Sequence, residues 1–157
     1  MKTIFIMILF FEITNIYLYS QTNQIQKHII PDSILRQFNI PNQGYAIIEF
    51  CTLGECAKCN LAAESQYQCL RDSLGIRMQL IASVFCNRKK EVDYFASTNN
   101  SYDSYKKTIE GWYNVFGIDY FTRIMVVRWD GDVQCTIDVG EFLKANFCKK
   151  ILMSLKK

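Results

Sequence analysis

Residues 45–59 read YAIIEFCTLGECAKC, and this stretch decides the fold. Its first part, Tyr45–Phe50, is a compact apolar run of strand length, as expected for an inner strand that is buried on both faces. After a short turn, the apolar residues from Cys56 to Leu74 recur at helical spacing. The stretch therefore predicts a strand, a turn and a helix, with the pair Cys56 and Cys59 at the start of the helix.

The alternation of strands and helices continues along the rest of the chain. Apolar runs predict three more strands, and Asp130-Gly131 is a strong two-residue hairpin signal between the last two. The strands are expected at Met78–Phe85, Ile124–Trp129 and Val133–Ile137, and helices at Ile29–Phe38, Arg88–Phe116 (broken at 97–101) and Val139–Leu155. A parallel pair needs a helical crossover, whereas a hairpin is antiparallel. The order predicts an α/β fold with a mixed four-stranded sheet and helices packed on both faces.

Length and composition exclude several classes of protein. The chain has 157 residues, which is enough for one domain, and half of them are hydrophobic, so a sizeable core can form. A net charge of +3, without a basic stripe interleaved with aromatic residues, argues against nucleic acid as a partner. The single histidine, His28, argues against a zinc site built on histidines.

The first twenty residues differ from the rest. Lys2 is followed by the apolar run Ile4–Phe11, which is the pattern of a secretory signal and is short for a transmembrane span. The sequence predicts a signal peptide at 1–20, a leader with a helix at 21–44 and one domain at 45–157. An uncleaved anchor or a buried N-terminal helix is the alternative. We expect an exported protein, periplasmic or extracellular, with no stable membrane span once the signal is removed.

This order of elements, with CxxC opening the first core helix, resembles the thioredoxin superfamily. The residues that carry the resemblance are YAIIEF, CAKC, FTRIMVVRWDGDV and the last helix, and the DG hairpin is most similar to the exported TlpA-like members. The resemblance implies an exported thiol–disulfide oxidoreductase that has no cofactor beyond its own dithiol. Its implied partners are exported cysteine-containing proteins or a membrane electron donor.

The resemblance assigns roles to three residues. Cys56 would be the nucleophile, because a helix N-terminus lowers the pKa of a thiol, and Cys59 would resolve the mixed disulfide. Glu49 aligns with the buried acid that many thioredoxins place beneath the CxxC, and it would accept the proton of the resolving thiol. The alternatives are that CAKC is a structural disulfide or half of a metal site, and that Glu49 pairs with a Lys or Arg or reaches solvent.

One departure from the family pattern concerns the residue before the third strand. Thr122 stands where the family has a cis-proline that lies against the disulfide and helps to hold the partner. A cis bond before a non-proline residue costs roughly 2.5–4 kcal/mol, which favours a trans bond here. Thr122 and Arg123 are the expected substrate-binding residues, with Arg123 as a source of charge near Cys56. The departure predicts slow exchange with general substrates and one dedicated partner.

Two other functions stay open. A thioredoxin-like binding module without turnover fits the missing proline. Binding of zinc or copper through Cys56, Cys59 and Cys51 fits a more open CxxC, although no histidine lies near the third strand as copper delivery would need. Cys51 and Cys86 close two predicted parallel strands at one edge, where they either form a second disulfide or pass electrons, or remain small buried side chains. Cys69, Cys135 and Cys148 show no recognisable spacing and receive no role.

Overall fold

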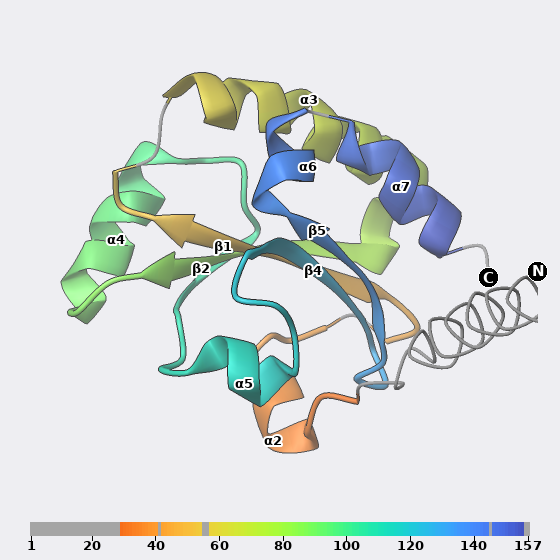
Figure 1. The fold of residues 1–157 in the computed structure, drawn as a ribbon, viewed down its shortest axis with the longest axis horizontal. Helices are drawn as coiled ribbons and strands as arrows, with labels where there is room; N and C mark the ends of the chain where they lie inside the picture. The colour runs from red at the N-terminus through yellow and green to blue at the C-terminus, as the bar shows by residue number, and fades with distance from the viewer. Residues whose placement is uncertain (1–28, 41, 55–56, 145, 156–157) are drawn as a thin grey trace, which may run out of the picture.

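A single mixed sheet forms the centre of the molecule. The structure, a computed structural model, describes residues 29–40, 42–54, 57–144 and 146–155, without the side chains of residues 57–62. The strand order is β3-β2-β1-β4-β5, and Figure 1 shows the sheet between two groups of helices. The strands are β1 (Tyr45–Thr52), β2 (Met78–Phe85), β3 (Ser104–Lys107), β4 (Thr122–Arg128) and β5 (Val133–Asp138).

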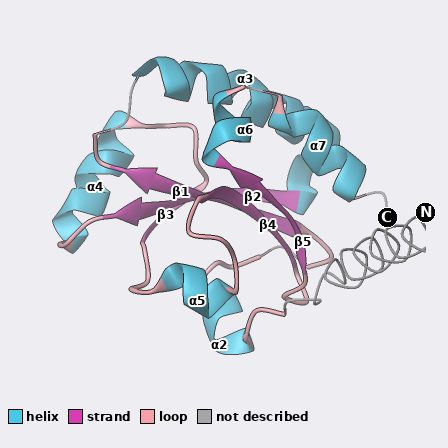
Figure 2. Cartoon of the chain, viewed as in Figure 1, coloured by secondary structure: helices cyan, strands magenta, loops and turns pink. Residues whose placement is uncertain are grey.

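Helices cover both faces of this sheet, which confirms the predicted class of fold (Figure 2). On one face lie α3 (Ala57–Leu74), α6 (Val139–Leu143) and α7 (Phe147–Ser154). On the other lie the short helices α2 (Asp32–Leu35) and α5 (Trp112–Phe116), while α4 (Lys89–Thr98) packs beside β3. A 3-10 turn, η1 (Gly75–Arg77), connects α3 to β2.

The pairing of the strands follows the sequence prediction. β1 and β2 are parallel neighbours, with Tyr45 opposite Met78. β4 and β5 form the antiparallel hairpin around Asp130-Gly131, and β4 also pairs antiparallel with β1. The carboxyl ends of β1 and β2 therefore meet the start of β4 at one edge of the sheet.

The side chains of β1 alternate between the two faces. Ile47 packs in the core beneath α3 and α7, whereas Ile48 and Phe50 pack in the core against α5, where Phe50 stacks on Trp112 at 3.9 Å between ring centroids. Six of the eight residues of β1 are buried, as a central strand requires. Glu49 is the charged residue among them, and it points to the same face as Ile47 because the side-chain period of a strand is two.

The sheet has five strands rather than four. The extra strand, β3, pairs parallel with β2 at the sheet edge and lies within the segment 88–116 that was expected to be mostly helical. Its sequence, SYKK, is short and polar, and edge strands with these properties avoid pairing with other chains. Because β3 lacks the apolar run that is typical of an inner strand, the sequence did not predict it.

Two predicted helices are also shorter in the structure. The closing helix expected at Val139–Leu155 is divided into α6 and α7, because Asn146 has φ −130° and ψ 18°, outside the helical region. The helix expected at Ile29–Phe38 contains a single α-helical turn, α2, followed by a turn that ends at the buried Phe38.

The segment before α2 is attached to the β4–β5 hairpin. The Ile30 amide donates to the Gly131 carbonyl at 2.8 Å, and the Ile30 side chain is buried in the core against α5. Gly131 has φ +86°, and a Cβ atom built there would lie 2.7 Å from the Ile30 carbonyl oxygen. Glycine is therefore required at this position both for backbone conformation and for the close approach of two chain segments.

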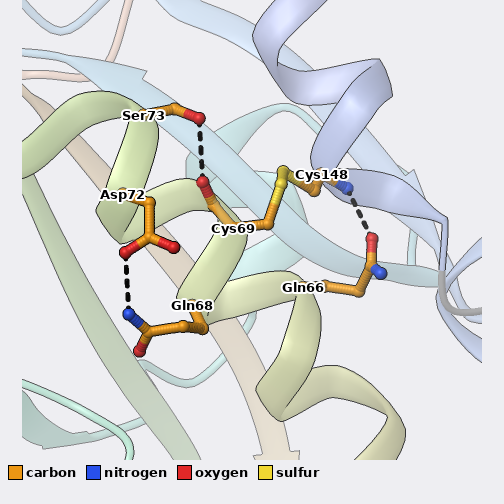
Figure 3. Close-up of a disulfide and its surroundings, with 6 residues drawn as sticks. All are labelled: Gln66, Gln68, Cys69, Asp72, Ser73 and Cys148. Carbon is orange, nitrogen blue, oxygen red and sulfur yellow. Dashed lines mark hydrogen bonds between the residues drawn. A yellow bond between two sulfur atoms is a disulfide. The ribbon is translucent and has the colours of Figure 1, made fainter.

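A disulfide joins two of the helices on one face. Cys69 of α3 and Cys148 of α7 are bonded across 79 positions of sequence, and Figure 3 shows the bond between the two helices. The Gln66 side chain accepts a hydrogen bond from the Cys148 amide at 3.1 Å beside it. Sequence analysis gave these cysteines no role, since their spacing carries no motif and only the packing of α7 on α3 brings them together.

No helix among the residues described here has the length and apolar character needed to cross a membrane. The N-terminal segment on which the prediction of export depends lies outside those residues.

We expect Gly131→Ala to destabilise the domain by about 1–3 kcal/mol, because alanine is strained at positive φ and its methyl group would meet the Ile30 carbonyl. Gly111→Ala is the matched control, since Gly111 has φ +64° but nothing within 4 Å of the added atom. Urea unfolding should show a clearly larger loss for Gly131→Ala. Equal losses in the two variants would contradict the role of the close contact.

We also expect the double variant Cys69→Ser/Cys148→Ser to lose about 2–4 kcal/mol of unfolding free energy, because the bond closes a long loop in the unfolded chain. Cys135→Ser is the control, as Cys135 is a partly buried thiol outside the disulfide. Unfolding in urea without reductant gives the comparison. A loss in the double variant no greater than that in the control would show that the bond does not stabilise the fold.

Candidate functional site

The sequence motif CAKC falls at the junction between β1 and α3. β1 ends at Thr52 and α3 begins at Ala57, so the backbone of Cys59 lies in the first turn of an 18-residue helix. That first turn contains no acidic residue, so the positive end of the helix dipole is not neutralised from within the helix. Cys56 and the Cys59 side chain lie outside the described residues, and their roles as nucleophile and resolving thiol stay predictions.

Glu49 forms the buried polar centre beneath α3. Its exposed fraction is 1%, and its two oxygens face different partners. Oε1 accepts from the Arg123 guanidinium, with Nη2 at 2.5 Å and Nε at 3.0 Å. Oε2 accepts from the Tyr102 hydroxyl at 2.8 Å and from the Tyr67 hydroxyl. This set of donors satisfies an ionised carboxylate, which would otherwise be very costly to bury.

The pairing of β1 with β4 places Glu49 opposite Ile124, the residue after Arg123. In a regular strand Arg123 would point to the opposite face from Ile124, but the register of β4 against β5 shifts between Thr122 and Ile124, and this irregularity lets the Arg123 side chain reach Glu49. The Arg123 side chain is only 12% exposed, and its guanidinium lies 4.8 Å from the centre of the Phe142 ring. The ring face attracts the cation and fixes its plane. Two guanidinium N–H groups donate to the same carboxylate oxygen, and both hydrogen bonds are strengthened by the opposite charges.

The two tyrosines add neutral donors. Burial and the neighbouring Glu49 carboxylate raise the pKa of Tyr67 and of Tyr102 far above the ordinary range, so both hydroxyls keep their protons at any working pH. The Tyr102 hydroxyl also lies 3.7 Å from the Cys51 sulfur. Sequence analysis missed these residues. Tyr67 was placed on the inward stripe of the helix, but a hydroxyl partner 18 positions away leaves no local signal.

Glu49 and Arg123 are the two charged residues that were expected at the functional site. Glu49 makes the ion pair that sequence analysis named as the alternative to a proton-accepting role. Arg123, which was expected to supply charge near Cys56, forms an ion pair with Glu49. Because Cys56 lies outside the described residues, the expected effect of Arg123 on its charge stays a prediction. The proton-accepting role of Glu49 remains a proposal. The chemistry visible in the described residues is a fixed, buried carboxylate beneath α3, which contacts the middle of that helix through Tyr67.

Thr122 begins β4 and is 5% exposed. No peptide bond among the described residues is cis, so Thr122 follows Phe121 through a trans bond. The Thr122 amide donates to the Asp119 carbonyl at 3.0 Å and closes a tight turn. Neither Thr122 nor Arg123 has much exposed surface, whereas Phe121 beside them is 68% exposed.

Cys51 and Cys86 lie at the same sheet edge but are not bonded to each other. Cys51 is fully buried and packs in a cluster with residues of α4, whereas Cys86 is partly exposed and lines a cavity of ≈ 990 Å³ together with Trp112 and Tyr120. Burial, and secondarily the Glu91 carboxylate, raise the pKa of Cys86. Within the described residues, no group of three or more Cys, His, Asp or Glu side chains is placed to hold a metal ion.

The Glu49–Arg123 pair should show strong energetic coupling. We expect Glu49→Gln and Arg123→Met each to cost about 3–5 kcal/mol of unfolding free energy, because each leaves a buried partner without its counter-charge. The double variant should cost clearly less than the sum of the two, since it leaves no orphaned charge. Urea unfolding of the four proteins measures the coupling.

Lys150→Met provides the control, because the Lys150–Glu141 pair is solvent-exposed. Such pairs contribute about 0–1 kcal/mol. Additive losses for Glu49 and Arg123, or a loss in Lys150→Met as large as in Arg123→Met, would contradict the assignment of the buried pair as the polar centre.

Comparison with protein-family models and with curated protein sequences gives no match. Solved structures do share the architecture. A thiol:disulfide interchange protein of the thioredoxin family from Chlorobium tepidum has a TM-score of 0.51 at 17% identity, with 72% of this chain and 81% of that chain covered. An uncharacterized thioredoxin-like protein from Porphyromonas gingivalis has a TM-score of 0.54 at 18% identity, covering 74% and 78%. The chain therefore has the thioredoxin-like fold.

Proposed function

We propose that this protein is an exported thiol–disulfide oxidoreductase that exchanges disulfides with other exported proteins through Cys56 and Cys59. The observation that carries the proposal is the place of CAKC in the chain, between the carboxyl end of the central strand β1 and the first turn of α3. In a thioredoxin-like sheet this junction lies at the edge where β4 also begins. A CxxC pair at a strand-to-helix junction is a far more specific signal than an isolated pair.

The reaction consists of two exchanges. The Cys56 thiolate attacks one sulfur of a partner disulfide, a mixed disulfide forms, and the other partner sulfur leaves as a thiolate. The Cys59 thiolate then attacks the Cys56 sulfur and releases the second partner sulfur. The partner gains two electrons and ends as a dithiol, with the two protons that the Cys56 and Cys59 thiols lose. The protein ends with a Cys56–Cys59 disulfide.

Two features of the chain support this chemistry. The N-terminus of α3, which begins one residue after Cys56 in the sequence, would stabilise a thiolate at Cys56. Lys58 adds positive charge nearby in the sequence, and Glu55 opposes it. Glu49 is the proposed acceptor of the Cys59 proton, because it is the buried carboxylate of β1 on the face that α3 covers.

Export has independent support from the cysteines. The Cys69–Cys148 disulfide is the kind of bond that persists in oxidising compartments. It agrees with the signal-like pattern at 1–20. In such a compartment the dithiol itself carries the electrons, so no cofactor is invoked. A membrane electron donor is the partner that would return the pair to the reduced state.

A thioredoxin-like binding module without turnover is the second candidate. It is favoured by one observation, namely that Thr122 stands in place of a proline and follows a trans peptide bond. A measurement of disulfide reduction distinguishes the oxidoreductase from the binding module. Reduced protein that transfers electrons to glutathione disulfide is an oxidoreductase, whereas a binding module would leave the disulfide intact.

We expect Cys56 to be alkylated at lower pH than any other thiol of the reduced protein. Cys86 is the internal comparison, because its raised pKa delays formation of the thiolate until the pH is higher than an ordinary cysteine needs. Iodoacetamide labelling across pH, followed by peptide mass spectrometry, should show Cys56 first, then Cys59 and Cys86.

The matched variants are Cys56→Ser and Cys59→Ser. Cys59→Ser should accumulate a stable mixed disulfide with a partner, whereas Cys56→Ser should form none. Two results would refute the proposed function. One is preferential labelling of Cys59, and the other is a wild-type dithiol that does not exchange with glutathione at any accessible redox potential.

A further inference from the structure

The turn that precedes β4 has already used the backbone groups that a docking peptide would need. The Phe121 amide donates to the Asp119 Oδ1 atom at 2.7 Å. The Phe121 carbonyl accepts from the Val139 amide at 3.1 Å, and the turn is closed by the Thr122 amide on the Asp119 carbonyl. Phe121 therefore has a paired N–H and a paired C=O, although its side chain is 68% exposed.

The position of the turn gives these bonds a functional meaning. The antiparallel register of β1 and β4 places Glu49 opposite Ile124, so the start of β4 lies beside the end of β1, where the loop toward Cys56 begins. Because β4 has β1 and β5 as neighbours, a cysteine-containing segment that approaches its start in extended form can pair only with free N–H and C=O groups of the turn that precedes β4. Phe121 offers neither group.

We propose that Asp119 is a specificity-determining residue that closes this turn to extended polypeptide partners. The inference rests on the proposed function, and concerns which disulfides the dithiol can reach. A partner must then be recognised mainly through side chains, for which Phe121 and the neighbouring Tyr120, 65% exposed, present apolar rings. The two rings lie 6.0 Å apart and form one aromatic surface beside the turn.

The two bonds that close the turn differ in how readily they can be removed. Val139 is the first residue of α6, and the N–H groups of the first turn of a helix have no partner within that helix. The hydrogen bond from the Val139 amide to the Phe121 carbonyl therefore also stabilises the start of α6. The bond from Phe121 to Asp119 depends on one exposed side chain. Substitution of Asp119 therefore frees the Phe121 amide while the carbonyl bond and the start of α6 stay in place.

The test compares two disulfide substrates under single turnover. Prereduced protein is mixed with insulin, whose disulfides lie in polypeptide segments, or with glutathione disulfide, which is too small to add as a strand. Each protein molecule gives two electrons and two protons to one disulfide. We expect Asp119→Ala to raise the ratio of the insulin rate to the glutathione rate about three- to tenfold, as one regained hydrogen bond allows.

Asp119→Asn is the matched control, because its side-chain oxygen can still accept from the Phe121 amide. Its ratio should stay at the wild-type value. A ratio that does not rise in Asp119→Ala, while glutathione exchange proceeds, would overturn this inference and leave the proposed function standing. Wild-type protein that reduces neither substrate would instead overturn the proposed function.

Amide hydrogen exchange tests the same contact in the wild-type protein and does not depend on the folding of a variant. The Phe121 amide should be protected despite its exposed side chain, and Asp119→Ala should reduce its protection at least several-fold without a matching change at Val139. An unprotected Phe121 amide in the wild-type protein would show that the turn is open, and the inference would fall.

Discussion

The burial of one carboxylate constrains how this domain can be assembled. Glu49 lies in the central strand, where a charge without partners would be intolerable, and its partners come from three other parts of the chain. Arg123 comes from β4, Tyr67 from α3, and Tyr102 from the segment before β3. The carboxylate is therefore satisfied only when three arrangements are correct together. These are the register of β4 on β1, the packing of α3 on the sheet, and the position of the segment that leads to the edge strand β3. Hydrophobic burial drives the collapse, but it does not distinguish these arrangements as sharply.

The fold was largely predictable because its inner strands are apolar and its hairpin has a specific turn. Both signals can be read from a few neighbouring residues. An apolar run such as Tyr45–Phe50 is typical of a buried strand, and Asp130-Gly131 is typical of a two-residue β-turn. The edge strand β3 was missed because solvent, rather than the core, selects its residues. The division of the last helix was missed because the residues of α6 and α7 keep one inward stripe across the break at Asn146.

The candidate site was predictable only in part. The positions of Cys56 and Cys59 follow from the strand-to-helix junction, which is a local pattern. The contacts of Glu49 do not follow from any pattern, because they depend on strand register and on hydroxyl groups far away in the sequence. Tyr67 looked like an ordinary core residue, and Arg123 looked available for the reactive thiol. The closure of the turn at Phe121 was only partly hidden: its amide bond is to Asp119, two residues earlier, whereas its carbonyl bond arises where α6 begins next to β4.

The Cys69–Cys148 bond also has a topological consequence. It makes a covalent ring that contains β2, β3, β4 and β5, whereas β1 lies outside the ring in sequence and yet occupies the middle of the sheet. If the ring closes first, β1 must enter between two strands that are already tethered to each other. If β1 is already in place, closure merely locks a finished sheet. The order of oxidation and assembly thus decides whether the last event in maturation is the insertion of a strand or the formation of a bond.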